Sequence, residues 1–196
     1  MADTDMKAER RVQILKAAEK LFARHGLKKT SMDDIAEAVG LVKTSLYYYF
    51  NSKEELFQTV IRHESETLIK RLQAEINKHS SPQRKLRAYF ITRMEYLKEL
   101  VNLSQLTKIA AQELLPLAEE ERHRFIETEK KLVLEILEEG SQSNIFEIGD
   151  PEFAAVAIIA SMRGLEPTLL LYQDRQLSMG DYEAMLNVLF YGILKG

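Results

Sequence analysis

Residues 31–53 constrain the fold more than any other part of the chain, because two short helical patterns meet there at a glycine. The apolar residues that share a face are Ile35, Ala36 and Val39 in the first pattern and Leu46 and Phe50 in the second. Gly40 lies between the two patterns, where the chain must turn. Two helices joined in this way form a helix-turn-helix, which presents its second helix outward as a DNA-reading element must.

The second helix of this pattern carries three consecutive tyrosines followed by a phenylalanine. At about 100° per residue, four consecutive aromatic residues sweep about 300° of the helix circumference, so they cannot all face one core. Leu46 and Phe50 are expected to point inward, and the residues between and before them point outward. Hydroxyl groups bond phosphate oxygens, and lysine reaches guanine edges or phosphates. The sequence therefore predicts a DNA-binding surface made of Lys43, Thr44, Ser45, Tyr47, Tyr48, Tyr49 and Lys53.

The same stretch resembles the motif of the TetR family of one-component transcriptional regulators, which approximates T-x-x-x-I-A-x-x-A-G-V-S-x-G-T-L-Y-x-Y-F-x-S-K-E-x-L. The matching positions are Ser31, Ile35-Ala36, Gly40-Leu41, Leu46-Tyr47, Tyr49-Phe50, Ser52-Lys53-Glu54 and Leu56. The resemblance implies a homodimer whose recognition helices enter successive major grooves of a palindromic operator, and a C-terminal domain that binds a small-molecule inducer. It also implies base contacts from Lys43, Thr44, Ser45 and Tyr47, and phosphate contacts from Tyr47, Tyr49 and Lys53.

Two positions depart from the family motif. Val42 replaces the usual serine before the recognition helix, which removes a side-chain cap. Thr44 replaces a common glycine and alters what faces the bases. The motif therefore predicts the class of regulator but not the operator sequence.

The remaining chain repeats apolar residues every three or four positions, so we predict an all-α protein of about nine helices in two domains. Residues 1–52 form the N-terminal helix-turn-helix domain, and residues 53–196 form a C-terminal ligand-binding and dimerisation domain. Residues 1–9 are expected to be a flexible arm. The expected helices outside the helix-turn-helix pair span about 9–25, 53–78, 82–100, 103–114, 116–140, 150–172 and 180–195, with a break or kink in the 150–172 helix at Gly164 and Pro167.

Helix start signals support these bounds. Ser31 is the expected N-cap of the first helix of the pair, with carboxylates in the following turn. Ser52 and Glu55 have the spacing of a capping box for the long helix that follows. Gly26 and Gly140 are expected to end helices. The loop 141–149 contains three large apolar residues and is expected to pack down.

Composition excludes several classes. The chain has 196 residues, of which 45% are apolar, and no cysteine, which rules out disulfides and thiolate zinc sites and fits a reducing cytoplasm. The longest apolar run, 153–162, is about half of the roughly 20 residues that a membrane span needs. Net charge is −3, but residues 1–60 carry +1 and the remainder −4, which permits a DNA partner.

The sequence does not indicate an enzyme. Its four histidines lie on different predicted segments without metal-ligand spacing, and no nucleophile or phosphate-loop motif occurs, so no metal, cofactor or catalytic residue is expected. The alternative to a regulator is a ligand-binding or scaffold protein of the same fold without specific DNA binding. The acidic net charge favours that alternative slightly, and the intact basic and tyrosine residues of the predicted DNA surface oppose it.

The last two predicted helices have more apolar surface than one small domain readily buries, which favours a homodimer through these helices. The candidate ligand-binding residues are polar or adaptable side chains in apolar contexts: Tyr89, Arg93, Met94, Met162, Arg163 and Glu166. Purely structural roles are the alternatives to ligand binding. Arg93 more readily forms a surface salt bridge, Arg163 and Glu166 pair with each other, and the methionines fill gaps in a core.

Overall fold

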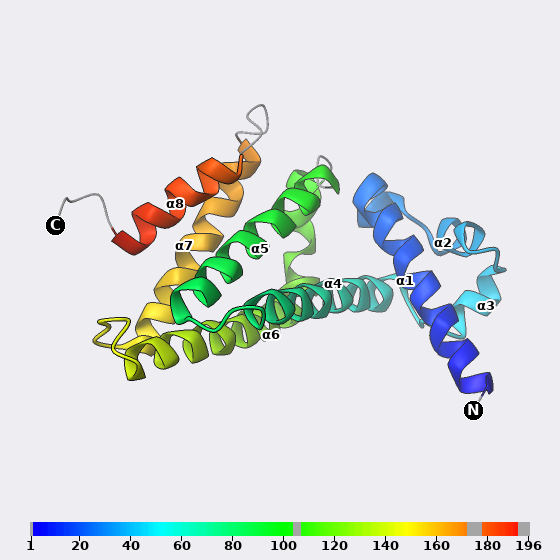
Figure 1. Cartoon of the computed structure of the whole chain (residues 1–196). Helices are drawn as coiled ribbons and strands as arrows, with labels where there is room; N and C mark the ends of the chain where they lie inside the picture. Colours follow the sequence, from blue (N-terminus) through cyan, green and yellow to red (C-terminus); the bar gives the residue numbers. More distant parts are fainter. Residues whose placement is uncertain (1, 104–106, 172–177, 192–196) are drawn as a thin grey trace. The chain divides into compact units, whose positions relative to one another are not determined.

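A computed structural model describes residues 2–103, 107–171 and 178–191, with side-chain detail for 6–96, 119–164, 178 and 180–188. The described residues form eight α-helices and no β-strand, so the prediction of an all-α fold is confirmed (Figure 1). They fall into two compact units. Unit 1 comprises residues 1–67 and 100–125, and unit 2 comprises 68–99 and 126–196. The functional boundary at residues 52–53 stays a prediction.

Unit 1 contains the helix-turn-helix, made of α1 (Ala2–Lys29), α2 (Met32–Ala38) and α3 (Lys43–Tyr47), followed by α4 (Lys53–Ile76). The ring centroids of Phe22 in α1 and Phe57 in α4 lie 5.5 Å apart, edge to face, a favourable aromatic geometry. Leu46 of α3 packs into a core shared by the four helices, so the opposite side of α3 faces outward. The buried core residues are Ile14, Leu15, Ala18, Phe22, Leu27, Met32, Ile35, Ala36, Leu46, Phe50, Leu56, Phe57 and Val60.

The predicted turn between α2 and α3 is confirmed at Gly40. Its φ of 66° lies in the left-handed region, which favours glycine because a Cβ there is strained. The Gly40 N–H donates to the Glu37 carbonyl at 3.0 Å, and the Leu41 N–H donates to the Ala36 carbonyl at 2.8 Å. These bonds close the end of α2 and direct the chain into α3.

Side-chain caps mark the starts of α2 and α4, whereas α3 begins without one. Ser31 caps α2 as predicted, because its hydroxyl accepts from the Asp34 N–H at 3.1 Å while the Asp34 carboxylate accepts from the Ser31 N–H at 2.7 Å. Val42 precedes α3 without a side-chain cap, as its apolar side chain predicts. The Ser52 hydroxyl accepts from the Glu55 N–H at 3.0 Å, but the Glu55 carboxylate bonds the N–H of the residue before Ser52.

Unit 2 combines the end of α4 with residues of α5 (Pro82–Leu103), α6 (Thr107–Gln142), α7 (Pro151–Leu171) and α8 (Met179–Tyr191). Apolar side chains at spacings of three and four on these helices face a common interior, as the periodicity predicts. The buried apolar residues of this unit are Leu68, Leu72, Ile76, Leu86, Ala88, Tyr89, Phe90, Met94, Leu132, Val133, Ile136, Leu137, Ala155, Ile159, Met162, Tyr182 and Leu186.

The helix count differs from the prediction because one long helix replaces two. The segments expected over 103–114 and 116–140 are a single helix, α6, which continues through Pro116 and ends at Gln142. An interior proline costs roughly 3 kcal/mol because it cannot donate the ladder hydrogen bond. A 36-residue helix has enough other backbone bonds and packed turns to absorb that loss.

Three other boundaries were predicted wrongly. α1 begins at Ala2, so residues 2–9 are helical instead of a flexible arm. α7 runs continuously through Gly164 and Pro167 to Leu171, so the break expected there is absent. Gly140 lies inside α6 and not at its end. Gly26, the expected end of the first helix, has a non-helical φ of 77° and kinks α1, and a short helical stretch follows it to Lys29.

Candidate nucleic-acid interface

α3 ends at Tyr47, so the prediction of one helix that carries all three tyrosines and Phe50 is wrong: Tyr48 and Tyr49 lie in the turn after α3, and Phe50 follows that turn. Leu46 and Phe50 are 0% exposed, as predicted, whereas Tyr47 is 43% and Tyr48 69% exposed. The outward side also holds the exposed Thr44 and the half-buried Ser45, whereas the half-buried Tyr49 packs against the core. Unit 1 therefore presents hydroxyl groups and aromatic rings on the side of α3 opposite its core.

Lys43, the first residue of α3, pairs with α2. Its Nζ donates to Asp33 Oδ2 at 2.6 Å, and the two side chains are 50% and 60% exposed. The hydrogen bond and negative charge of Asp33 raise the pKa of Lys43, so the amine stays charged. Because exposed ion pairs contribute little to stability, a DNA phosphate or base can replace Asp33 at small cost.

Lys53, the first residue of α4, binds the end of α1. Its Nζ donates to the Leu27 carbonyl at 2.8 Å, and the side chain is half-buried. This bond satisfies a carbonyl near a helix end, where carbonyls lack intrahelical partners. An ammonium group has three donors, so the Leu27 bond leaves donors available for a phosphate.

Two basic residues of α1, which the sequence analysis missed, reach the C-terminal end of α3. Arg11 Nη1 donates to the Tyr49 carbonyl at 2.8 Å, and its guanidinium lies 4.2 Å from the Phe50 ring centroid. Lys7 Nζ donates to the Tyr48 hydroxyl at 3.2 Å and lies 4.3 Å from the centroid of that ring. The four-residue spacing of Lys7 and Arg11 was the available signal, because it puts both on one helix face. The expectation that residues 1–9 form a flexible arm left Lys7 outside any helix, so this spacing was not used.

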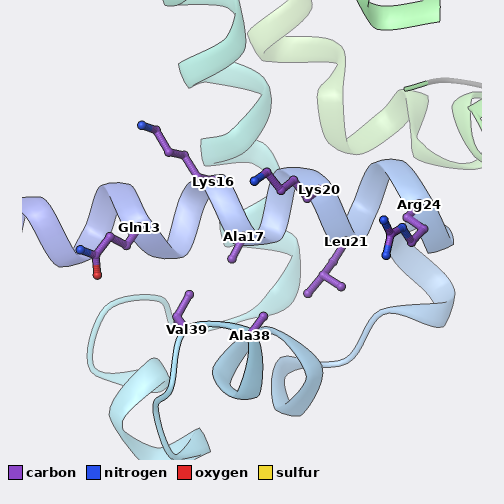
Figure 2. A pocket seen from close by; sticks show the side chains of 8 residues that line it. All are labelled: Gln13, Lys16, Ala17, Lys20, Leu21, Arg24, Ala38 and Val39. Atoms are coloured by element: carbon purple, nitrogen blue, oxygen red, sulfur yellow. The ribbon is translucent and has the colours of Figure 1, made fainter. Parts of the chain in front are cut away.

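A groove of about 510 Å³ lies between α1 and α2. Figure 2 shows the side chains that line it. In this view Ala17 and Leu21 point toward Ala38 and Val39, and Lys16 points away from α2. The small alanines allow the two helices to approach closely. The basic side chains that line the groove are Lys16, Lys20 and Arg24. None of the predicted DNA-binding residues lines this groove.

In unit 2, two predicted ligand residues of α5 converge on a buried carboxylate of α6 that the sequence analysis missed. The Tyr89 hydroxyl donates to Glu129 Oε1 at 3.0 Å, and Arg93 Nε donates to the same oxygen at 2.8 Å. The Arg93 and Glu129 side chains are 8% and 1% exposed. The surface salt bridge expected for Arg93 is therefore wrong, because the pair is buried. Among the described atoms, Glu129 Oε2 is buried without a hydrogen-bond partner.

The side chains of the other predicted ligand residues are described, with one exception. Met94 and Met162 are buried in unit 2, at 1% and 2% exposure, and Arg163 is half-buried. The side chain of Glu166 lies outside the described residues. Glu129 occupies the apolar stripe of α6 together with Leu132 and Val133, so a carboxylate at a core position of a helix was the signal that sequence could have offered.

Large apolar side chains are exposed on α7 and α8. Phe153 and Val156 in α7 are 70% and 46% exposed, and Val188 in α8 is 54% exposed. Alanines at positions 157, 160 and 184 of these helices are exposed as well. Contiguous exposed apolar surface of this kind is typical of protein interfaces.

Neither a metal cluster nor a membrane span occurs in the part of the chain that the structure describes. No group of three or more His, Asp or Glu side chains there is arranged to hold a metal ion. None of the helices there combines the length and the apolar character needed to cross a bilayer.

Comparison with known proteins connects the helix-turn-helix to a regulatory family. Residues 14–60 match the family described as bacterial regulatory proteins, tetR family. The HTH-type transcriptional repressor KstR2 of Mycolicibacterium smegmatis is 32% identical over 143 residues, which cover 71% of this chain and 68% of that protein.

Solved structures share the whole fold. A transcriptional regulator from Cytophaga hutchinsonii has a TM-score of 0.72 and 30% identity, covering 91% of this chain and 94% of that one. The transcriptional regulator FadR from Bacillus subtilis, solved in complex with stearoyl-CoA, has a TM-score of 0.74 and 21% identity, covering 93% of this chain and 99% of that one. At that identity the second likeness concerns the fold alone.

Proposed function

Since this chain belongs to the TetR family of bacterial transcriptional regulators, we propose that it is a homodimeric repressor that binds a palindromic operator and is released by a small-molecule inducer. The observation that carries the proposal is the orientation of α3 and the turn after it, which bury Leu46 and Phe50 and leave Thr44, Tyr47 and Tyr48 exposed. A helix held in this way can enter a major groove.

The proposed DNA contacts divide by chemistry. Lys43, Thr44 and Ser45 at the start of α3 are placed to reach base edges, because a recognition helix reads bases with its N-terminal residues. Tyr47, Tyr48, Tyr49 and Lys53 are proposed to contact phosphates, with Lys7 and Arg11 adding positive charge beside the tyrosines. Lys7 and Arg11 also hold the backbone and rings at the end of α3, which fixes the orientation of that surface.

Dimerisation is proposed through α7 and α8, because these helices expose Phe153, Val156 and Val188. A two-fold axis through such an interface would be mirrored by two operator half-sites about one helical turn apart. Phe153→Asp places a charge in the proposed interface and should yield monomers in sedimentation velocity. Val12→Asp, at an exposed apolar position of α1, is the matched control and should stay dimeric. A Phe153→Asp variant that remains fully dimeric would contradict this interface.

The inducer is proposed to bind unit 2 near Tyr89, Arg93 and Glu129. The support is the buried Glu129 Oε2, which has no hydrogen-bond partner among the described atoms and can accept from a ligand hydroxyl or amine. FadR of Bacillus subtilis, with the same fold, was solved with stearoyl-CoA, so acyl-CoA thioesters are the first compounds to test. Release requires that the ligand bind the DNA-free state more tightly than the DNA-bound state.

The deciding experiment is a selection from random operators with the full chain, followed by fluorescence anisotropy on the selected duplex. A palindromic consensus bound at least about 1,000-fold more tightly than scrambled DNA is expected. Tyr47→Phe, which removes one hydroxyl, should weaken that binding about tenfold with an unchanged melting temperature. A selection that yields no consensus would refute operator binding.

A further inference from the structure

Unit 2 contains a groove apart from the Tyr89–Arg93–Glu129 cluster. Its volume is about 510 Å³, within the range of roughly 300–1,000 Å³ that small-molecule sites occupy. The walls come from the starts of α5 and α7, the end of α6 with the loop after it, and α8. The apolar side chains that line it are Leu86, Leu137, Ile145, Phe146, Ile148, Ala154, Ile158 and Leu186. Such a lining favours a ligand with a large apolar surface.

One wall of the groove is a loop that the backbone holds in place. A Cβ added to Gly140 would lie 2.0 Å from the Phe146 ring, so glycine is what allows this ring to lie against α6. The N–H groups of Ile145 and Phe146 both donate to the Gly140 carbonyl, at 2.8 and 3.1 Å. Asn144 takes a left-handed φ of 53°, which asparagine tolerates better than most residues. The wall is therefore formed before any ligand arrives.

The charged side chains of the lining cancel. Arg84 and Arg87 are matched by Glu147 and Glu183, and Arg87 Nε donates to Glu183 Oε2 at 3.2 Å. A charged ligand would lose its hydration in the groove without meeting a net opposite charge, which is unfavourable. The polar groups that remain uncharged in the lining are the amides of Gln83 and Asn187. They can each give or accept a hydrogen bond.

We propose that this groove binds an uncharged, largely apolar small molecule that carries one or two hydrogen-bonding groups. The apolar body lies on the side chains of α5, α6, α7 and α8, and the Gln83 and Asn187 amides meet its polar end. This site goes beyond the operator-binding function and does not depend on it, because every residue involved belongs to unit 2.

The test uses the uncharged fluorescent probe N-phenyl-1-naphthylamine and the full chain without DNA. Ala154→Trp places a large ring in the groove and should weaken probe binding about tenfold or more. Ala74→Trp, at an exposed position of α4 outside the groove, is the matched control and should bind like the wild type. If Ala154→Trp does not fold by circular dichroism, Asn187→Trp at the exposed rim replaces it, with the same expected loss.

Competition distinguishes the proposed ligand class from an amphipathic anion. The matched compounds are 1-decanol and decanoate, which share a chain length and differ in charge at neutral pH. The alcohol should displace the probe at a concentration about tenfold or more below that of decanoate. Equal or better displacement by decanoate, or unchanged probe binding in the groove-filling variant, would overturn the proposal. Since no DNA is present, either result leaves operator binding to its own test.

Discussion

Two charged pairs, one in each unit, differ in how far they are removed from water. In unit 1, Lys43 and Asp33 pair at the surface, with side chains 50% and 60% exposed. In unit 2, Arg93 and Glu129 pair in the interior, at 8% and 1% exposure. Water already solvates the first pair, so a DNA phosphate can replace Asp33 easily. The second pair is removed from water, so each charge must keep its partner or receive another from a bound molecule.

This contrast separates a surface suited to exchanging partners from a cluster suited to fixing one arrangement. A DNA-binding face is solvated in the free protein and covered by phosphates in the complex. Its charged groups must therefore exchange one partner for another at a small cost in free energy. A ligand site gains selectivity from buried polar groups, because a ligand that fails to satisfy them leaves them unpaired. The predictions below test each half of the contrast, beginning with the largest effect.

Removing one member of the buried pair should have the largest effect on stability. Arg93→Ala leaves the Glu129 carboxylate in the interior with only the Tyr89 hydroxyl shown bonding to it. The free energy of unfolding is expected to fall by roughly 3–5 kcal/mol in urea denaturation at neutral pH.

The control for that variant removes both charges. Arg93→Met combined with Glu129→Leu replaces the pair by apolar groups of similar length, which is often close to neutral for stability. The double variant should therefore recover most of the loss. If Arg93→Ala costs less than about 1 kcal/mol, water reaches the pair and the contrast between the two pairs fails.

The second prediction concerns Glu64, a half-buried carboxyl of α4 in unit 1. Burial first, and then the negative charge of Glu19, raise the Glu64 pKa from 4.5 to about 7. Well below pH 4.5 the group is protonated in both the folded and the unfolded chain, so it has no effect on stability. Between pH 4.5 and about 7 the unfolded chain ionises first, and the stability of the fold declines.

Glu64→Gln removes this ionisation. Its free energy of unfolding should equal that of the wild type at pH 4.5 and exceed it by up to about 3 kcal/mol at pH 8. Glu66→Gln, at an exposed position of the same helix, is the matched control and should show no such rise. Urea denaturation at pH 4.5, 6 and 8 measures the difference. A constant difference across these pH values would show that Glu64 does not titrate in this range.

Sequence predicts the helix-turn-helix well because its determinants are local. The spacing of Leu46 and Phe50 fixes which side of α3 is buried, Gly40 supplies the turn, and Ser31 caps α2 through the residue three positions later. The Arg93–Glu129 pair joins residues 36 positions apart. Periodicity places each residue on the inner side of its helix, but only the packing of α5 against α6 determines that they meet.

The same reasoning accounts for the misses in unit 1. A proline or a polar N-terminal stretch indicates only a local preference against helix. That preference is overridden in α6, which continues through Pro116, and at the start of α1, which is helical from Ala2. Lys7 and Arg11 are visible in the sequence only as two charges. Their contacts with Tyr48 and with the backbone at Tyr49 arise because α1 lies beside the end of α3.

The third prediction tests the phosphate role of Lys53. Lys53→Ala should lower affinity by a similar factor for operator and scrambled DNA, and reduce the slope of log K against log salt by about one unit. Loss of the bond to the Leu27 carbonyl also destabilises the fold, but stability alone does not change the salt slope. Lys70→Ala, at an exposed position of α4, removes the same charge and should leave the slope unchanged. An unchanged slope for Lys53→Ala would remove this residue from the phosphate contacts.

The smallest expected effect concerns the exposed pair itself. Asp33→Asn frees the Lys43 amine and removes a negative charge beside it, so DNA should bind about threefold more tightly at low salt. The gain should shrink as salt rises, because exposed charges are screened. Anisotropy at two salt concentrations measures both effects.

Glu37→Gln is the matched control for this variant, because it removes the same charge from an exposed position of α2 one helical turn away. If only the general field of α2 matters, both variants gain equally. If Asp33 competes with DNA for Lys43, Asp33→Asn gains more, and the additional Lys43→Ala substitution abolishes the difference. Equal gains would mean that the Lys43–Asp33 pair is not an exchange site, and its exposure would then no longer set it apart in function from the buried Arg93–Glu129 pair.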